Sequence, residues 1–483
     1  MVWTIDQVIF FAFLIFNVIL GLKSSKGITS ITQYAIGDRN FSTGALVATI
    51  VATWIGGGFF IENIIENYTN GLYYFFTSIA QVLSFFIIGY FFIPRMKEFL
   101  GKLSIAEAMG EIYQNKVRLI VSVCGFIGVS GIIAIQFKVA GLVFEHLLNI
   151  SRFQGIFLTG IVVILYSTMG GVKSVTFTDM MQIFTFGTTI PLVIYYLSSN
   201  VFYSHDLVFF TIINHPEFDL SRIFDKDNIK SWTYLFLFFY CLIPAFDISI
   251  FQRIAISSNI SQAQKSFYIS GVIILIITLF MTFLAILLIT KNPSLNSNDV
   301  INTLLFDNTP PFLKGLLVIG ITAMIMSTAD SYLNSSAVIF VHDFLKSLNV
   351  KINNELLTAR LVSIIIGILA IILSFKETSI FRLALFTAGF YMPIVTVPFI
   401  MAIFGYRTPY EKAVLYGMGA GLAVVLLWSY LDITVIDNIV PAMAANWLVL
   451  ITSNNTTAIS DGKVPCIPLY TIMTNNCVVY RRS

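Results

Sequence analysis

Two hydroxyl side chains, Ser327 and Thr328, lie in the segment ITAMIMSTADSYLN, which is otherwise apolar enough to lie inside a membrane. A second apolar segment, VATWIGGGFFIENIIEN, holds consecutive glycines at 56–58. Each glycine weakens a helix by about 1 kcal/mol relative to alanine, so this run predicts a helix break. A broken helix exposes carbonyl oxygens, and carbonyl and hydroxyl oxygens are ligands that hard cations prefer. The chemistry of the two segments is therefore compatible with a cation site.

Both features also have structural explanations. Buried serine and threonine commonly hydrogen-bond to a neighbouring helix or to the carbonyl four residues earlier in their own helix. Consecutive glycines also allow two membrane helices to pack closely. The residues alone do not choose between these explanations and a cation site.

Acidic residues inside apolar segments are a second kind of candidate, because charge in a membrane span is costly and usually functional. Asp247 follows Pro244 in FYCLIPAFDISIFQR. A carboxylate there favours a solute with a positively charged nitrogen; the alternatives are pairing with Lys138 and a place near the surface. Asp179 follows Thr178 in TFTDMMQ, where it is either a functional acid or a first-turn residue whose charge suits the helix dipole.

Glu62 and Glu66 lie one helical turn apart beyond the glycines, and so on one face of a helix. They are candidates for an outer vestibule that concentrates cations, although for Glu66 a place at the membrane surface is the favoured alternative. Some aromatic residues near the expected breaks could stack on an ammonium group by cation–π attraction. They are Trp54, Phe59, Tyr240 and Phe246.

The composition requires a membrane to position these residues. Of the 483 residues 57% are hydrophobic and 11% are charged, against about 25% charged in soluble domains. Net charge is +3 without a basic block, which argues against nucleic acid as a partner. The four cysteines show neither disulfide nor metal-ligand spacing, and the four histidines are scattered, so we expect no enzyme.

About 13 apolar segments are long enough to cross a bilayer. Most of the 28 basic residues fall on loops that share one side if the N-terminus is outside and the C-terminus is cytoplasmic. The expected spans are 4–22, 43–66, 72–94, 118–148, 154–169, 177–199, 233–256, 266–289, 312–344, 357–374, 380–404, 411–430 and 436–452.

The second and seventh of these spans both contain a helix breaker, the glycines at 56–58 and Pro244. Because the two spans are five apart, they predict two five-helix repeats of opposite orientation, each with a broken first helix. We therefore expect an all-α membrane protein with a five-plus-five inverted-repeat core. The expected divisions are a first helix and loop (1–42), a first repeat with an outer loop (43–232), a second repeat (233–406), two further helices (407–452) and a polar tail (453–483).

Three further motifs, YSTMGGVKSVTFTDMMQ, FQRIAISSNISQAQKSF and STADSYLNSS, occur in the same order as in a known family. With ATWIGGG, the chain resembles the sodium:solute symporter family, and most of all its sodium/proline and high-affinity choline branches. The resemblance implies a central sodium site and, at Asp179, an acid involved in sodium handling. The implied ligands are the carbonyls of Ala52, Ile55 and Met324 and the hydroxyls of Ser327 and Thr328.

The resemblance also implies a solute site between the second, third and seventh spans. Trp54 stands where the proline-transporting members carry an acid, which argues against proline as the solute. The residues expected to contact the solute are Trp54, Gly56, Phe59, Gln81, Ser84 and Asp247.

The resemblance implies a sodium-coupled secondary active symporter, with sodium, a small organic solute and the lipid bilayer as partners. The solute is expected to be an amino acid, a choline- or betaine-like compound, or a vitamin-like compound. The alternatives are a sodium/pantothenate or sugar symporter and a solute-binding membrane sensor on the same fold. A bacterial inner membrane is the expected location, with a monomer or a homo-oligomer as the expected assembly.

Overall fold

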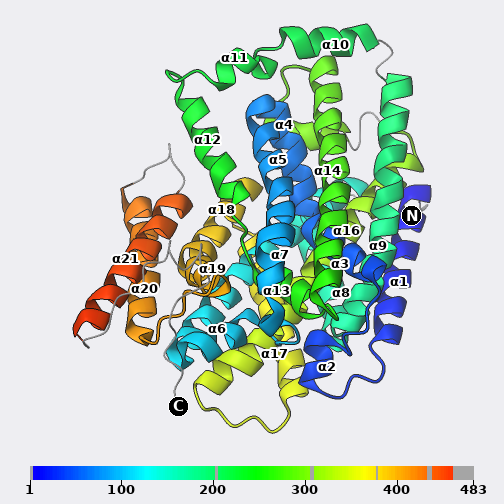
Figure 1. The fold of residues 1–483 in the computed structure, drawn as a ribbon. Coiled ribbons are helices and arrows are strands. Elements are labelled where there is room, and N and C mark those ends of the chain that lie inside the picture. Colours follow the sequence, from blue (N-terminus) through cyan, green and yellow to red (C-terminus); the bar gives the residue numbers. More distant parts are fainter. Residues whose placement is uncertain are drawn as a thin grey trace.

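The computed structural model describes residues 4–148, 150–201, 205–304, 309–376, 379–431 and 438–460. These residues form a bundle of long helices, with no β-strand among them (Figure 1). Within the described ranges, 10 helices are long and apolar enough to cross a membrane, or up to 11 if the bent pair Thr43–Trp54 and Gly57–Asn70 is one span. The chain is therefore an integral membrane protein of the all-α class.

The helices follow the expected apolar segments closely. Their bounds are α1 (Ile5–Ser24), α2 (Ile31–Ile36), α3 (Thr43–Trp54), α4 (Gly57–Asn70), α5 (Leu72–Ile87), α6 (Ile105–Tyr113), α7 (Asn115–Leu148), α8 (Arg152–Met169), α9 (Val172–Tyr196), α10 (His205–Asn214), α11 (Leu220–Ile223), α12 (Ile229–Leu242), α13 (Ile248–Ala255), α14 (Ile260–Lys291), α15 (Ser297–Asn302), α16 (Leu313–Val338), α17 (Glu355–Ser374), α18 (Ile380–Tyr391), α19 (Val397–Ile403), α20 (Glu411–Tyr430) and α21 (Ile439–Ser460). Short π-helical turns extend α16 as η7 (Ile339–Leu345) and join α18 to α19 as η8 (Met392–Thr396).

Both expected helix breaks are present. α3 and α4 are bent by 57° at their junction, and α12 ends at Leu242, before Pro244, while α13 begins at Ile248. The two broken helices open the two five-helix repeats, so the inverted-repeat fold is confirmed. The full count of 13 spans stays a prediction, because α12 is a shorter apolar helix and α21 is not among the ten.

Two differences from the expected boundaries change the interpretation. α9 begins at Val172, directly after Gly170 and Gly171, and not near residue 177. Asp179 therefore lies well inside the helix and cannot be a first-turn residue. α21 continues to Ser460, into the segment expected to be a polar tail, while residues 461–483 lie outside the described part of the chain.

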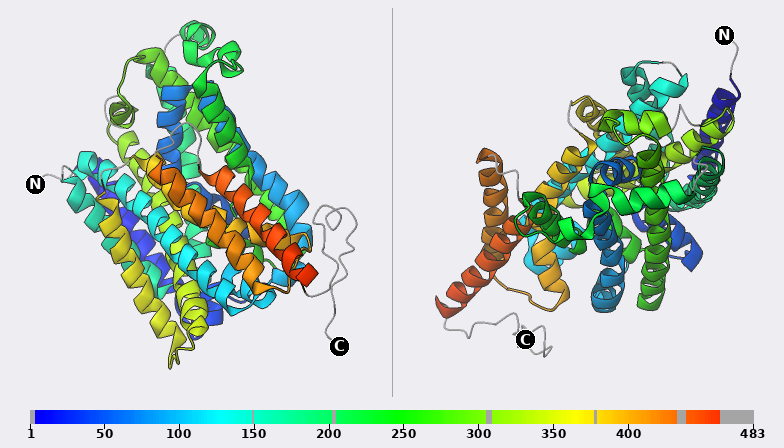
Figure 2. Two further views of the ribbon diagram at one scale, coloured as in Figure 1. Left: turned by 90° about the vertical axis from the view of Figure 1, so that its left-hand side faces the viewer. Right: turned by 90° about the horizontal axis from the view of Figure 1, so that it is seen from above.

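α16 is the central helix of the bundle and is buried along nearly its whole length. It contacts α1, α3, α4, α7, α8, α9 and α17. By contrast, α20 and α21 pack mainly on each other and on η8, at the edge of the molecule (Figure 2). The polar residues of α16 are therefore held against most of the bundle, whereas those of the last two helices are not.

The N-terminus of α16 is capped by a side chain from a distant helix. Asp6 of α1 accepts hydrogen bonds from the backbone N–H of Phe312 at 2.7 Å and of Gly315 at 2.8 Å. The first N–H groups of a helix have no partner within the helix, and a carboxylate also suits the positive end of the helix dipole. Asp6, itself buried, thus links α1 to α16.

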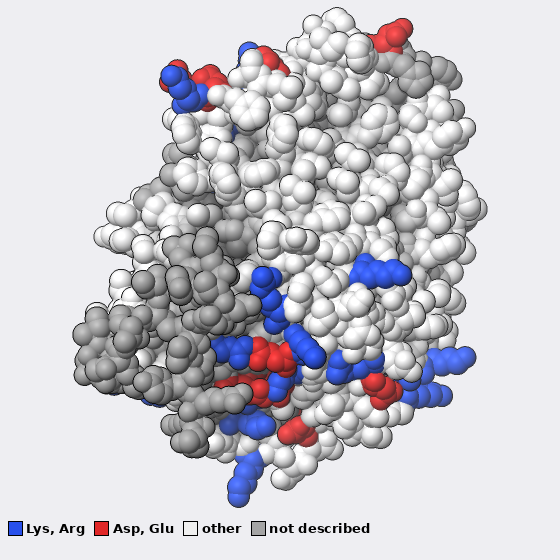
Figure 3. Space-filling view, in the orientation of Figure 1, with Lys and Arg blue, Asp and Glu red and all other residues white. Residues whose placement is uncertain are grey.

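The surface is divided by polarity along the length of the helices. On the face seen in Figure 3, a small group of charged side chains lies at the top and a larger group covers the lower part up to about mid-height, with an uncharged region between the two groups. The larger group of basic residues lies at the end where α2 and α6 are found (Figure 1). An uncharged belt between two charged ends is what a membrane-spanning bundle presents to lipid.

Candidate functional site

The break between α3 and α4 redirects backbone hydrogen bonds. In a continuous helix the Gly56 N–H would donate to the Ala52 carbonyl, but here it donates to Trp54 at 3.0 Å. The Gly58 N–H donates to the Gln136 side chain of α7 at 3.3 Å. The Ala52 carbonyl is consequently left for a partner from outside its own helix.

That partner comes from α16. The Ser327 hydroxyl donates a short hydrogen bond to the Ala52 carbonyl, and its oxygen lies 3.5 Å from the Met324 carbonyl oxygen. The Thr328 hydroxyl donates to the Thr53 carbonyl at 3.1 Å. The oxygens of Ala52, Met324 and Ser327 thus meet at one point, as the expected ion site requires.

Thr328 and Ile55 complete the expected set at the same junction. A Cβ atom at Gly56 would lie 2.7 Å from the Thr328 hydroxyl oxygen, and Ile55 is fully buried between the two half-helices. The hydrogen bonds from Ser327 and Thr328 also link α16 to α3, which is the structural alternative considered for these two hydroxyls. The ion-ligand role of this set remains a prediction.

The three glycines both break the helix and allow close helix packing. Ile55 and Gly56 form the break, whereas Gly57 and Gly58 belong to α4. A Cβ atom at Gly57 would lie 2.4 Å from Ile325 Cγ1, and one at Gly58 would lie 2.3 Å from Ile135 Cγ2. Close packing against α16 and α7 therefore requires the second and third glycines.

The break between α12 and α13 is closed by side chains. The carbonyl of Ala245 accepts a hydrogen bond from Thr396 at 2.7 Å, and that of Phe246 accepts one from Tyr391 at 3.1 Å. Asp247 then caps α13, its Oδ1 accepting the N–H groups of Ser249 and Ile250 at 2.8 and 2.9 Å. Two carbonyls of this extended segment and two N–H groups of the first turn of α13 thus have partners within the protein.

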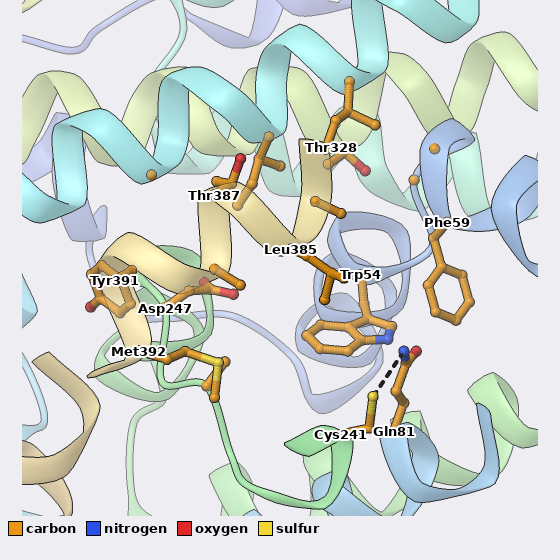
Figure 4. Close-up of a pocket in the computed structure, with 18 of the residues that line it drawn as sticks. Trp54, Phe59, Gln81, Cys241, Asp247, Thr328, Leu385, Thr387, Tyr391 and Met392 are labelled. Carbon is orange, nitrogen blue, oxygen red and sulfur yellow. Dashed lines mark hydrogen bonds between the residues drawn. The ribbon is translucent and has the colours of Figure 1, made fainter. Parts of the chain in front are cut away.

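A cavity of about 260 Å³ lies between the two breaks. All six residues expected to contact a solute line it: Trp54, Gly56, Phe59, Gln81, Ser84 and Asp247. Thr328 also lines it, so the cavity is continuous with the expected ion site. Figure 4 shows the Trp54 indole and the Gln81 amide pointing toward one another, while Asp247 lies beside Tyr391 and Met392.

Asp247 neither pairs with Lys138 nor lies near the surface, which were the two alternatives to a solute contact. Its Oδ2 accepts a hydrogen bond from Tyr332 at 3.0 Å, and the carboxylate faces the cavity rather than the surface. Lys138 instead donates to the Lys376 carbonyl at 2.8 Å. The alternative in which Asp247 pairs with Lys138 is therefore not what the structure shows.

The two glutamates beyond the glycines differ in position. Glu62 lines the cavity and accepts a hydrogen bond from the Tyr74 hydroxyl at 3.0 Å. Glu66 does not line it and accepts from Asn70 at 2.8 Å. Only Glu62 therefore belongs with the cavity.

Asp179 lies in a fully buried charged cluster on the other side of the first break. Its Oδ2 accepts a hydrogen bond from Thr49 at 2.5 Å and lies 3.8 Å from the Arg253 guanidinium. Asp330 of α16 accepts a hydrogen bond from the Tyr166 hydroxyl at 3.0 Å. One guanidinium thus faces two buried carboxylates, and the Oδ1 atom of each has no hydrogen-bond partner in the described structure.

Arg253 ties this cluster to the first break. Its Nη2 donates to the Thr53 hydroxyl at 2.8 Å and to the Ser331 hydroxyl at 2.6 Å. Thr53 immediately follows Ala52, and Ser331 lies one turn beyond Ser327 and Thr328. Arg253 therefore connects Asp179, through an ion pair, to the elements that form the expected ion site.

Several cavity residues were not identified from the sequence. Gln136 could have been noticed, because an amide inside a long apolar segment needs a partner. The others give no local signal, since their roles follow from which face of an apolar helix meets the cavity. They are Tyr74, Thr77, Tyr332, Thr387 and Tyr391.

This fold is that of known sodium-coupled transporters. A solved substrate-bound outward-open state of a Na⁺-coupled sialic acid symporter matches with a TM-score of 0.82 at 18% identity, covering 95% of this chain and 98% of that one. The structure of MhsT in complex with L-phenylalanine matches with a TM-score of 0.53 at 16% identity, covering 86% and 99%. At these identities the likeness establishes the fold.

The sequence places the chain within a family. The profile of the sodium:solute symporter family matches residues 34–421, and the chain belongs to that family. The sodium/sialic acid symporter of Aliivibrio fischeri is 23% identical over 88% of this chain and 87% of its own length. The sodium/pantothenate symporter of Haemophilus influenzae is 24% identical over 90% of this chain and 92% of its own length. A high-affinity choline transporter of Drosophila melanogaster is 22% identical over 77% of this chain and 61% of its own length.

Proposed function

We propose that this protein is a sodium-coupled symporter that imports a small organic solute by alternating access. The observation that carries the proposal is the junction of α3, α4 and α16. There, backbone carbonyls released by a helix break meet two hydroxyls beside a cavity. Family membership and the fold support the same conclusion.

In this proposal sodium binds to the carbonyl oxygens of Ala52, Ile55 and Met324 and the hydroxyl oxygens of Ser327 and Thr328. The hydroxyls of Ser327 and Thr328 rotate their hydrogens away from the carbonyls of Ala52 and Thr53 and present lone pairs to the ion. An all-oxygen set of this kind suits a hard cation. Asp179, linked to the same elements through Arg253, is proposed to be a transient sodium ligand on the path toward the cytoplasm.

Coupling follows from the shared position of the two sites. Sodium bound at the junction holds α4 against α16, and so orders Gly56 and Thr328, which also line the solute cavity. Inward movement of sodium supplies about 2.3 kcal/mol per 100 mV of membrane potential, in addition to its concentration gradient. Solute accumulation uses that free energy.

We further propose that the N-terminus is outside and the C-terminus cytoplasmic, in a bacterial inner membrane. The gathering of basic residues at the α2 and α6 end supports this orientation (Figure 3). The two repeats are then 43–232 and 233–406, flanked by 1–42, by 407–452 and by the segment after 452.

The proposal is tested by uptake into liposomes that contain the purified protein. Proline, choline, glycine betaine, pantothenate and glucose are supplied with an inward sodium gradient or with the gradient replaced by potassium. Uptake of at least one solute should require sodium. Sodium-independent uptake of every transported solute would contradict coupling, and saturable binding of a solute without any uptake would identify a sensor instead.

A further inference from the structure

The described residues that line the cavity carry negative charge and no positive charge. Glu62 and Asp247 are both among them, and they include no lysine, arginine or histidine. In a low-dielectric site, a charge without a partner is strongly unfavourable. The lining therefore disfavours a solute with a carboxylate and favours one with a positive charge.

Neither carboxylate is neutralised by the protein around it. Asp247 accepts from two backbone N–H groups and from Tyr332, and Glu62 accepts from Tyr74. All these donors are neutral, and neither acid takes part in an ion pair within the described ranges. A positively charged ligand would therefore supply the counter-ion that these two acids lack among the described residues.

The rest of the lining suits the apolar surface of an organic cation. Aromatic rings provide electron-rich faces that attract ammonium groups, an interaction strengthened when water is excluded. The Trp54 and Phe59 rings lie with their centroids 6.5 Å apart on the side of the first break. The aromatic residues of the lining are Trp54, Phe59, Tyr74, Tyr240, Tyr332 and Tyr391.

Two buried polar atoms in the lining have no hydrogen-bond partner among the residues that the structure describes. They are the indole Nε1 of Trp54, a donor, and the Oε1 of Gln81, an acceptor. In Figure 4 these two groups point toward one another, away from Asp247. A hydroxyl group can accept from the indole and donate to the amide oxygen at once, whereas a carboxylate can only accept.

We infer that the transported solute is a small organic cation that carries a hydroxyl group and no carboxylate. Its positive nitrogen lies among the aromatic rings near Asp247 and Glu62, and its hydroxyl lies between Trp54 and Gln81. The cavity volume of about 260 Å³ is just below the usual range of ligand pockets, roughly 300–1,000 Å³, which suits a small solute. This inference rests on the proposed function.

Three probes of nearly equal shape test the charge requirement. Choline has the positive nitrogen and the hydroxyl, glycine betaine replaces the hydroxyl carbon with a carboxylate, and 3,3-dimethyl-1-butanol replaces the nitrogen with carbon. Each is measured as a competitor of sodium-driven uptake of radiolabelled choline into liposomes containing the purified protein. Choline should be at least about ten-fold more potent than either analogue, the factor that loss of one charge-assisted contact produces.

Conservative variants test the two carboxylates. Glu62→Gln and Asp247→Asn each remove one charge, and asparagine keeps the capping function at the start of α13. Each variant should weaken choline competition roughly ten- to hundred-fold, as loss of a charge-assisted hydrogen bond does. Glu66→Gln is the matched control, because Glu66 lies one turn from Glu62 on α4 and outside the cavity lining; it should leave choline competition unchanged.

The outcomes separate the solute class from the transport function. Three results would overturn the inference and leave symport standing. The first is that glycine betaine or 3,3-dimethyl-1-butanol competes as strongly as choline, and the second is that choline competition is unchanged in both acid variants. The third is sodium-driven uptake of anionic or neutral solutes without uptake of choline. Sodium-dependent thermal stabilisation of the solute-free protein tests the ion site separately. If sodium neither stabilises the protein nor drives uptake of any probe, the proposed function itself fails.

Discussion

The two broken helices of this protein differ in how the backbone groups freed by each break are bonded. Between α3 and α4 the break is two residues long, and its released carbonyls accept hydrogen bonds from hydroxyls of another helix. Between α12 and α13 the break is longer. Two of its carbonyls also accept hydrogen bonds from hydroxyls, those of Thr396 and Tyr391, but here the Asp247 carboxylate caps the helix that follows. The helix after the first break, α4, has no side-chain cap, whereas the helix after the second break, α13, is held by the Asp247 carboxylate.

This difference assigns different roles to the two breaks. Hydroxyl oxygens can either donate to a carbonyl or join that carbonyl in coordinating a cation, so the first break suits a reversible ion site. A carboxylate that caps a helix loses several hydrogen bonds if it moves. The second break is therefore suited to hold one wall of the cavity in a fixed shape.

Removing both hydroxyls at the first break should have the largest effect. Ser327→Ala combined with Thr328→Ala deletes two expected sodium ligands. Because each lost ligand is worth about 1–3 kcal/mol, the apparent sodium affinity of uptake should fall about 100-fold or more. The sodium dependence of uptake measures it. Ser336→Ala is the control, because Ser336 bonds within its own helix, to Leu333 at 3.0 Å. Unchanged sodium affinity in the double variant would refute the ion-site assignment.

The second-largest effect is expected from adding a side-chain atom at the close helix contact beside the first break. Gly57→Ala places a Cβ atom 2.4 Å from Ile325, and such overpacking costs about 1–3 kcal/mol. The thermal unfolding temperature in detergent should fall. Gly44→Ala in α3 is the matched control, because its Cβ would lie 4.0 Å from its nearest neighbour. If the two variants unfold alike, the tight approach of α4 to α16 is not needed.

The second break should respond to loss of its cap. Asp247→Ala removes the acceptor for the Ser249 and Ile250 N–H groups and should destabilise the protein by about 1 kcal/mol. Asp247→Asn, which keeps that acceptor, should be close to the parent protein in thermal unfolding. Equal destabilisation by the two variants would mean that the charge, and not the cap, stabilises this segment.

The smallest effect is expected from a single hydroxyl at the second break. Thr396→Val leaves the Ala245 carbonyl without its donor and should cost about 1 kcal/mol in stability while the sodium affinity of uptake stays unchanged. Thr282→Val, which removes only a bond within α14 to Thr278, should be milder. A weakened sodium affinity in Thr396→Val would show that the two breaks are not independent.

The sequence predicts the existence of both breaks because glycine and proline act locally on the backbone. It does not predict where the first break falls, since that depends on Ile325 and Ile135, which are distant in sequence and come into contact only in the folded bundle. The same reason explains Asp179. TFTD has the composition of a helix start, yet α9 already begins at Val172 after two glycines.

The solute cavity was predicted only in part. Trp54, Gln81 and Asp247 could be named because they match positions in a known motif pattern, and they do line the cavity. Tyr332 and Tyr391 could not be named, because helices that are apolar on all sides give no periodic signal for the face that meets a cavity. Their positions are set by how α16 and α18 pack in three dimensions.

The cap that Asp6 places on α16 constrains how the protein can move. Alternating access requires one group of helices to rotate against another as rigid bodies. The two hydrogen bonds that Asp6 accepts join α1 to the first turn of the helix that carries Ser327 and Thr328. α1 must therefore travel with α16 during transport, or these two bonds must break in every cycle.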